Sequence, residues 1–194
     1  MALVYLLHHQ GKIITMKKTI LYFLIVSVLF SFSTAKELTP SDTGSSIKFV
    51  IKNFGTNVDG SFKGLQGKIN FDAANPGTSS ITISADANSI NTGIKMRDNH
   101  LRKEEYFDVA KYPRISFTST KISAGSTAGS YQVTGKFTIK NITKDISFPF
   151  TAETSDNGVL FKSSFKINRR DFGVGGNSAV MSDFVTINLS ILAK

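Results

Sequence analysis

Apolar and polar residues alternate along most of the chain beyond residue 45. In the stretch 133–140, for example, Val133, Phe137 and Ile139 fall on one side of an extended chain and Lys136 on the other. Because successive side chains of a β-strand point to opposite faces, this period of two predicts strands with one apolar and one polar face. The runs that show it are 47–52, 81–86, 115–118, 133–140, 142–150, 161–167 and 185–191, and two shorter strands are expected at 58–62 and 69–71.

Turn-forming residues separate the predicted strands. The clearest are Asn75-Pro76-Gly77, the stretch 124–130 and Asp156-Asn157-Gly158. About eight strands at hairpin spacing, each apolar on one face, are typical of an antiparallel β-barrel, and the fold is therefore predicted to be mainly β. Pro149 predicts a strand edge or a bulge, because proline has no N–H group to donate to a neighbouring strand.

The segment 94–107 breaks the alternation. It is dense in charge and has no period of two, so we predict one or two short helices that cross an end of the barrel. Arg97 and His100 are three residues apart, with Asp98 between them, and so lie near one another on a helix. We expect a polar cluster at the barrel mouth that binds the head group of a ligand. The same residues also suit an ordinary helix end, where charged side chains cap and pair.

The beginning of the chain has the pattern of a secretory leader. Lys17 and Lys18 precede an apolar run of 13 residues at 20–32, and small residues lead up to Ala35. We predict an upstream extension and signal peptide over 1–35, cleaved near Ala35, and a barrel domain over 36–194. The expected location is periplasmic or secreted. A retained anchor is the weaker interpretation, because a membrane-spanning helix needs about 20 apolar residues.

Composition limits the chemistry. The chain has no cysteine, and His100 is the only histidine beyond residue 35, so a zinc site of the usual His/Cys type is not expected. No Gly-x-Ser-x-Gly motif is present, and the glycines at 173, 175 and 176 lack the strand-then-helix context of a nucleotide-binding loop. We therefore predict a protein that is not an enzyme.

The net charge of +9 falls to +6 when Lys12, Lys17 and Lys18 leave with the leader. This balance suits transient contact with an anionic membrane surface, and equally an ordinary exported protein with solvated lysines. Export argues against nucleic acid as a partner.

Several fragments resemble the YceI-like family, the lipocalin-like polyisoprenoid-binding proteins of bacteria. They are Arg97-Asp98-Asn99-His100-Leu101, Tyr106-Phe107-Asp108-Val109, the stretch 112–117, the stretch 133–139, Ile142-Thr143-Lys144 and the stretch 167–174. The resemblance implies an eight-stranded antiparallel lipocalin-like β-barrel, export to the periplasm, and a long isoprenoid or similar amphiphile in an apolar channel. No cofactor is implied beyond a bound isoprenoid lipid or quinone.

Our hypothesis is an exported soluble carrier for an amphiphilic lipid. An eight-stranded barrel either is filled by its own side chains or holds one slender ligand, and the pattern leaves this choice open. The residues expected to line the channel are Phe49, Ile51, Phe62, Phe71, Ile83, Phe117, Phe137, Ile139, Phe148, Phe161, Phe165, Ile167, Val185, Ile187 and Leu189. Those expected at the head group are Arg97, His100 and Arg170, with Asp98 and Asp171 orienting the cations.

Two other classes remain open. An outer-membrane β-barrel also alternates and also follows a signal peptide, although its apolar face points outward to lipid. An enzyme acting on an amphiphile would use His100 as its acid or base. A homodimer is also expected if barrel closure leaves a free strand edge.

Overall fold

Most of the chain beyond the predicted leader is built from β-strands. The structure is a computed structural model that describes residues 36–194. The predicted signal peptide and its cleavage site near Ala35 lie outside the described residues. The elements are β1 (Lys36–Leu38), β2 (Pro40–Asn53), β3 (Thr56–Phe71), η1 (Pro76–Thr78), β4 (Ser80–Asn91), α2 (Lys95–Leu101), β5 (Arg114–Ala124), β6 (Ser130–Ile139), β7 (Ile142–Ser155), β8 (Gly158–Asn168), η2 (Arg169–Phe172) and β9 (Met181–Ala193).

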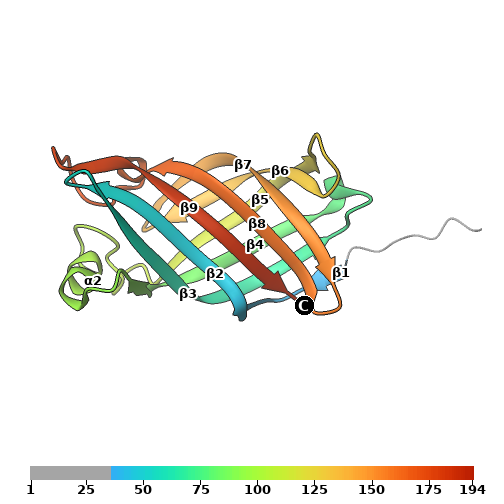
Figure 1. The fold of residues 1–194 in the computed structure, drawn as a ribbon, viewed down its shortest axis with the longest axis horizontal. Helices are drawn as coiled ribbons and strands as arrows, with labels where there is room; N and C mark the ends of the chain where they lie inside the picture. The colour runs from blue at the N-terminus through green and yellow to red at the C-terminus, as the bar shows by residue number, and fades with distance from the viewer. Residues whose placement is uncertain (1–35) are drawn as a thin grey trace, which may run out of the picture. The chain divides into compact units, whose positions relative to one another are not determined.

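The strands β2 to β9 form a closed antiparallel barrel (Figure 1). Their order is β3-β2-β9-β8-β7-β6-β5-β4, and β4 pairs back onto β3 to complete the ring. The short strand β1 pairs only with the end of β3, where Lys36 lies opposite Phe71. The predicted mainly-β, eight-stranded antiparallel fold is confirmed.

The alternation in the sequence becomes the inside and outside of this barrel. On β6, Tyr131, Val133 and Ile139 are buried, whereas Gln132 and Lys136 are exposed. Val133 lies opposite Phe148 on β7, so apolar side chains meet across neighbouring strands.

One pair of neighbouring strands separates over part of its length. β7 pairs with β8 only from Thr151 to Ser155, and within the part of the chain that the structure describes no pairing joins the stretch 142–150 of β7 to β8. Pro149 lies just beyond the last pair, where β7 has no backbone pairing with β8 and the Pro149 carbonyl accepts from the hydroxyl of Ser163 at 2.6 Å. The pairing of β6 with β7 runs through Pro149 without a shift, so the proline marks an edge and not a bulge.

The end of the barrel that holds β1 is packed solid. Phe71, Tyr131, Phe150 and Phe161 form a cluster of rings whose centroids lie 5.1 to 6.4 Å apart. Phe71 and Phe161 were expected along the channel, but they belong to this filled end. The period of two predicts that a side chain points inward and says nothing of its depth along the barrel axis.

The opposite end carries α2, the hairpin between β2 and β3, and the loop that leads into β9 (Figure 1). The predicted helical segment 94–107 contains a single helix, Lys95–Leu101, followed by turns closed by backbone hydrogen bonds such as Tyr112 N–H to the Asp108 carbonyl, 2.8 Å. No helix in the described range is long and apolar enough to cross a membrane.

Candidate ligand-binding site

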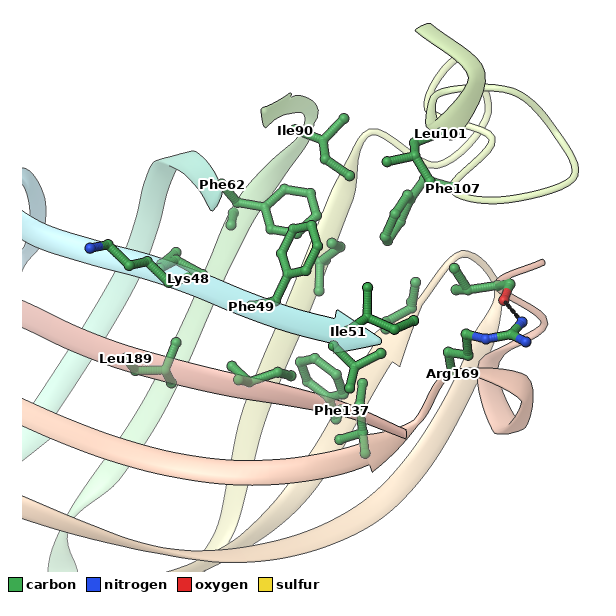
Figure 2. Close-up of a pocket in the computed structure, with 18 of the residues that line it drawn as sticks. Lys48, Phe49, Ile51, Phe62, Ile90, Leu101, Phe107, Phe137, Arg169 and Leu189 are labelled. Atoms are coloured by element: carbon green, nitrogen blue, oxygen red, sulfur yellow. Dashed lines mark hydrogen bonds between the residues drawn. The ribbon is translucent and has the colours of Figure 1, made fainter. Parts of the chain in front are cut away.

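A cavity occupies the half of the barrel nearest α2 (Figure 2). Its volume is about 200 Å³. Apolar side chains make up nearly all of its wall. The sequence-predicted channel residues that line it are Phe49, Ile51, Phe62, Ile83, Phe117, Phe137, Ile139, Phe148, Phe165, Ile167, Val185, Ile187 and Leu189.

Aromatic rings form the floor of the cavity. Phe148 and Phe165 stack with their centroids 4.1 Å apart and their planes at 10°. Phe117 lies against Phe148 at 5.2 Å. Below this layer the packed end of the barrel begins, so the interior is open in one half and filled in the other.

The wall on the side of β2 and β3 continues into the segment after α2. The rings of Phe49 and Phe62 lie 5.5 Å apart, and Phe62 meets Phe107 edge to face at 5.5 Å (Figure 2). Gly60 leaves room for this arrangement, because a Cβ at that position would collide with the ring of Phe49. Leu101 and Phe107 hang over the mouth from the helical segment.

Several lining residues were not in the predicted set. They are Ile47, Val58, Leu65, Ala85, Ile90, Leu101, Tyr106, Phe107, Ile115, Val174 and Met181, together with the polar residues Asn53, Ser84, Thr92, Ser116 and Arg169. Ile47, Ala85 and Ile115 carry the apolar phase of their strands and were detectable from it. The residues outside the strands have no such signal, because irregular segments lack a fixed period.

Arg97 is the predicted head-group residue that lines the cavity. Its Nε donates to the hydroxyl of Thr92 at 2.7 Å, and its Nη2 donates to the Thr92 carbonyl at 2.8 Å. A guanidinium has five N–H groups, and within residues 36–194 the other three have no hydrogen-bond partner. Arg97 therefore has donors to offer to a ligand at the mouth.

Asp98 is buried and holds the loop before the helix. Its Oδ1 accepts from the Thr92 N–H at 2.8 Å and from the Thr92 hydroxyl at 2.6 Å. Because that same hydroxyl oxygen accepts from Arg97, the carboxylate orients Arg97 through Thr92 and does not line the cavity itself.

The other predicted head-group residues lie outside the cavity. His100 is half exposed, 3.5 Å from the carboxylate of Glu105, and its ring stands edge-on to Tyr106. Arg170 pairs with Asp183 at 3.3 Å, and Asp171 is exposed. These residues are close in the sequence to segments that form the mouth, but the local backbone turns direct their side chains away from the interior of the cavity.

Arg169, which the sequence analysis did not single out, is the buried cation of the site. Its side chain is 3% exposed. It donates to the carbonyls of Val174 and Gly176 from Nη1, to that of Ser182 from Nε, and to the Met181 carbonyl and Asp183 from Nη2, at 2.9 to 3.5 Å (Figure 2 draws one of these bonds). All five N–H groups are used, so Arg169 has no donor left for a ligand. Its hydrogen bonds instead fix the loop between η2 and β9. Lys48 also borders the cavity, but its ammonium points away from it (Figure 2).

A closed antiparallel barrel with an apolar cavity open at one end defines a ligand-binding barrel of the lipocalin-like type. The family model for the YceI-like domain matches residues 38–193, and the chain belongs to this family. The resemblance noted in the sequence is thereby confirmed.

Relatives and solved structures agree with this assignment. Protein YceI of Salmonella arizonae is 28% identical over 191 residues, which span 91% of this chain and 97% of that protein. The crystal structure of Burkholderia cenocepacia BcnA superposes with a TM-score of 0.75 at 27% identity, covering 80% of this chain and 99% of that one. A polyisoprenoid binding domain from Saccharophagus degradans shares the fold, with a TM-score of 0.65 at 18% identity over 84% of this chain and 99% of that domain.

Proposed function

We propose that the protein is an exported, non-enzymatic carrier that holds an isoprenoid or similar amphiphilic lipid in the barrel cavity. The tail lies against the apolar wall, and the polar head remains at the mouth beside Arg97. The observation that carries the proposal is the pairing of an apolar cavity with Arg97, a cation at its mouth that has unused donors.

The ligand class follows from the two ends of the site. An apolar wall of phenylalanine, isoleucine and leucine side chains binds hydrocarbon through burial and asks for no hydrogen bond from it. A guanidinium donates well to phosphate and to other acceptor oxygens, which suits a polyprenyl phosphate or a quinone. The shared fold with a polyisoprenoid binding domain supports the same class.

The outward face of the barrel argues against an outer-membrane barrel. Lys48, Lys136 and Lys162 are exposed on three different strands. A lysine on the lipid face costs roughly 2–4 kcal/mol at the bilayer midplane, so this surface suits water.

The enzyme alternative rests on His100, which stands outside the cavity beside Glu105 and Tyr106. A base must lie within hydrogen-bond reach of the proton that it removes. Turnover of an isoprenoid substrate that disappears in His100→Gln, while binding survives, would restore this alternative.

Export and oligomeric state have simple tests. Mass measurement of the protein released by osmotic shock, without detergent, is expected to show a chain beginning near Lys36. Light scattering of the same material tests the predicted homodimer.

The central experiment is native mass spectrometry of the purified protein, followed by titration with a fluorescent prenyl probe. We expect a co-purifying lipid, and weaker probe binding in Ile187→Ala and Phe137→Ala, which enlarge the cavity. Thr186→Ala and Lys136→Ala, at the neighbouring outward positions, are the matched controls. Failure of the protein to bind any prenyl probe, or equal effects of inward and outward variants, would refute the proposal.

A further inference from the structure

Large apolar side chains are exposed at one end of the barrel. Among the described residues the well-exposed ones are Phe54 (76%), Ile94 (53%), Met96 (82%), Val180 (42%) and Phe184 (62%), which we call the rim residues. They belong to the β2–β3 hairpin, the start of α2 and the beginning of β9, all at the end where the cavity opens (Figure 1). The loops of the opposite end, 72–79, 124–130 and 155–158, contain no large aliphatic or aromatic residue.

The rim residues border the cavity mouth directly. Phe54 follows Asn53, Met96 precedes Arg97 and Val180 precedes Met181, and in each pair the second-named residue lines the cavity. The backbone N–H of Phe54 donates to the carbonyl of Val180 at 2.9 Å, so two of the rim segments touch. Single exposed apolar residues are common, but their restriction to the surround of one opening is not.

The conformation of Phe54 strengthens this argument. Phe54 and Gly55 have φ angles of 51° and 75°, as in a type I′ hairpin turn. The first position of that turn favours asparagine or aspartate, and a bulky residue with positive φ is strained. Neither packing nor turn geometry therefore accounts for a phenylalanine that is 76% exposed at this position.

Cationic side chains stand among the rim residues. Lys95 lies between Ile94 and Met96, and Lys52 lies two residues before Phe54; both are exposed. Neither lysine forms an ion pair in the part of the chain that the structure describes. Apolar side chains flanked by free cations match the interface of a bilayer that contains anionic lipid.

We infer that the rim residues dock the open end of the barrel onto an anionic bilayer, with Phe54 and Met96 inserted among the acyl chains. This inference rests on the proposed carrier function, because docking brings the cavity mouth to the surface where a lipid tail leaves the membrane. The tail of the lipid ligand can then move between the bilayer and the cavity with little contact with water. The outward-facing side chains of the barrel wall stay in water.

The absence of tryptophan from the chain allows a direct test. Phe54→Trp introduces one reporter at the rim, and Asn157→Trp introduces one at the opposite end. With vesicles of phosphatidylcholine and phosphatidylglycerol, the emission of Phe54→Trp is expected to shift to the blue and to be quenched by brominated acyl chains. The emission of Asn157→Trp is expected to stay unchanged.

Removal of the rim side chains gives the second measurement. Phe54→Ser with Met96→Ser is expected to lower the partition onto these vesicles about tenfold or more, since each apolar side chain loses its burial. Lys95→Gln is expected to lower it about fivefold, and only when anionic lipid is present. Lys121→Gln, which removes an exposed lysine at the far end of β5, is the charge-matched control.

The outcomes separate docking from carriage. Prenyl-probe binding measured in solution, without vesicles, is expected to be equal in the wild type and the rim variants. If the rim variants bind vesicles as the wild type does, or the wild type ignores vesicles altogether, docking is refuted and the carrier function stands. Failure of the wild type to bind the prenyl probe in solution refutes the carrier function. A rim variant that turns a dimer into a monomer without changing vesicle binding identifies a second copy of the chain as the occupant of the rim, and docking is again refuted.

Discussion

Phe148 on β7 and Phe165 on β8 stack face to face, 4.1 Å between centroids, where the backbones of these two strands are not paired. Elsewhere in the barrel, neighbouring strands are joined by backbone pairing. At this place the bond from the Ser163 hydroxyl to the Pro149 carbonyl and the contact between the two rings hold the wall together, and the rings also form the floor of the cavity.

Phe148→Ala is therefore expected to destabilise the protein by about 3–5 kcal/mol and to deepen the cavity. Denaturant unfolding measures the first effect, and titration with prenyl probes of increasing length measures the second. Phe150→Ala, two residues further on in the packed end, is the control: it should cost similar stability and leave the preference for tail length unchanged. Equal shifts in length preference for both variants would show that the stack does not set the depth of the cavity.

Arg97 is expected to recognise the charged head of the ligand. Arg97→Gln removes charge-assisted hydrogen bonds worth about 1.5–3 kcal/mol, so affinity for a prenyl phosphate probe should fall about tenfold to a hundredfold. Thr92→Val should cause a smaller loss, because it removes the hydroxyl that holds Arg97 Nε and leaves the bond from Nη2 to the carbonyl of residue 92 in place. Arg170→Gln, outside the cavity, should bind as the wild type does, and isothermal titration distinguishes the three.

Arg169 is expected to act on stability and not on recognition. Arg169→Lys leaves several carbonyls around the loop between η2 and β9 without a donor, and each buried unsatisfied group costs about 1–3 kcal/mol. We expect a large drop in melting temperature and little change in the ratio of affinities for prenyl phosphate and prenyl alcohol. Arg170→Lys, on the exposed side of the same Asp183, should be close to neutral in both measurements. A variant of Arg169 that folds normally but loses phosphate discrimination would contradict this division of roles.

We expect Asp72, at the packed end of the barrel, to make the stability of the protein depend on pH. The side-chain amide of Asn75, helped by the N–H groups of Ala74 and Asn75, holds the pKa of this carboxyl below its ordinary 3.8. The unfolded chain then binds more protons than the folded one, so this contribution to stability is present above about pH 4 and is lost as the pH falls through the folded-state pKa. Thermal melts of the wild type and Asp72→Asn should differ by a constant amount near neutral pH and converge in acid. A difference that is independent of pH would refute the assignment.

The strand content of this protein was readable from local pattern. Side chains at Val133, Phe137 and Ile139 alternate with polar neighbours, and this alternation alone assigns them to the inner face of β6. Pro149 likewise predicted a strand edge from a single residue, because proline has no N–H group to donate to a neighbouring strand. The family assignment also came from short fragments, since they keep their order along the chain.

The division of the barrel into an open and a filled half was not readable in this way. Phe71 and Phe165 have the same phase on their strands, yet Phe71 packs in the closed end and Phe165 lines the cavity. Position along the barrel axis depends on strand tilt and on the register of several strands together, and no local period carries that information.

The alternation of the sequence by itself determined that this chain folds as antiparallel strands with an apolar inside, because side-chain direction in a strand is a local property. The tertiary structure decided which cations serve the site. Arg97 keeps free donors at the mouth. Arg169 donates all of its N–H groups to the loop before β9 and to Asp183, and Arg170 pairs with Asp183 on the exposed side. That choice depends on partners as far as 14 positions away in the sequence, which only the folded chain brings together.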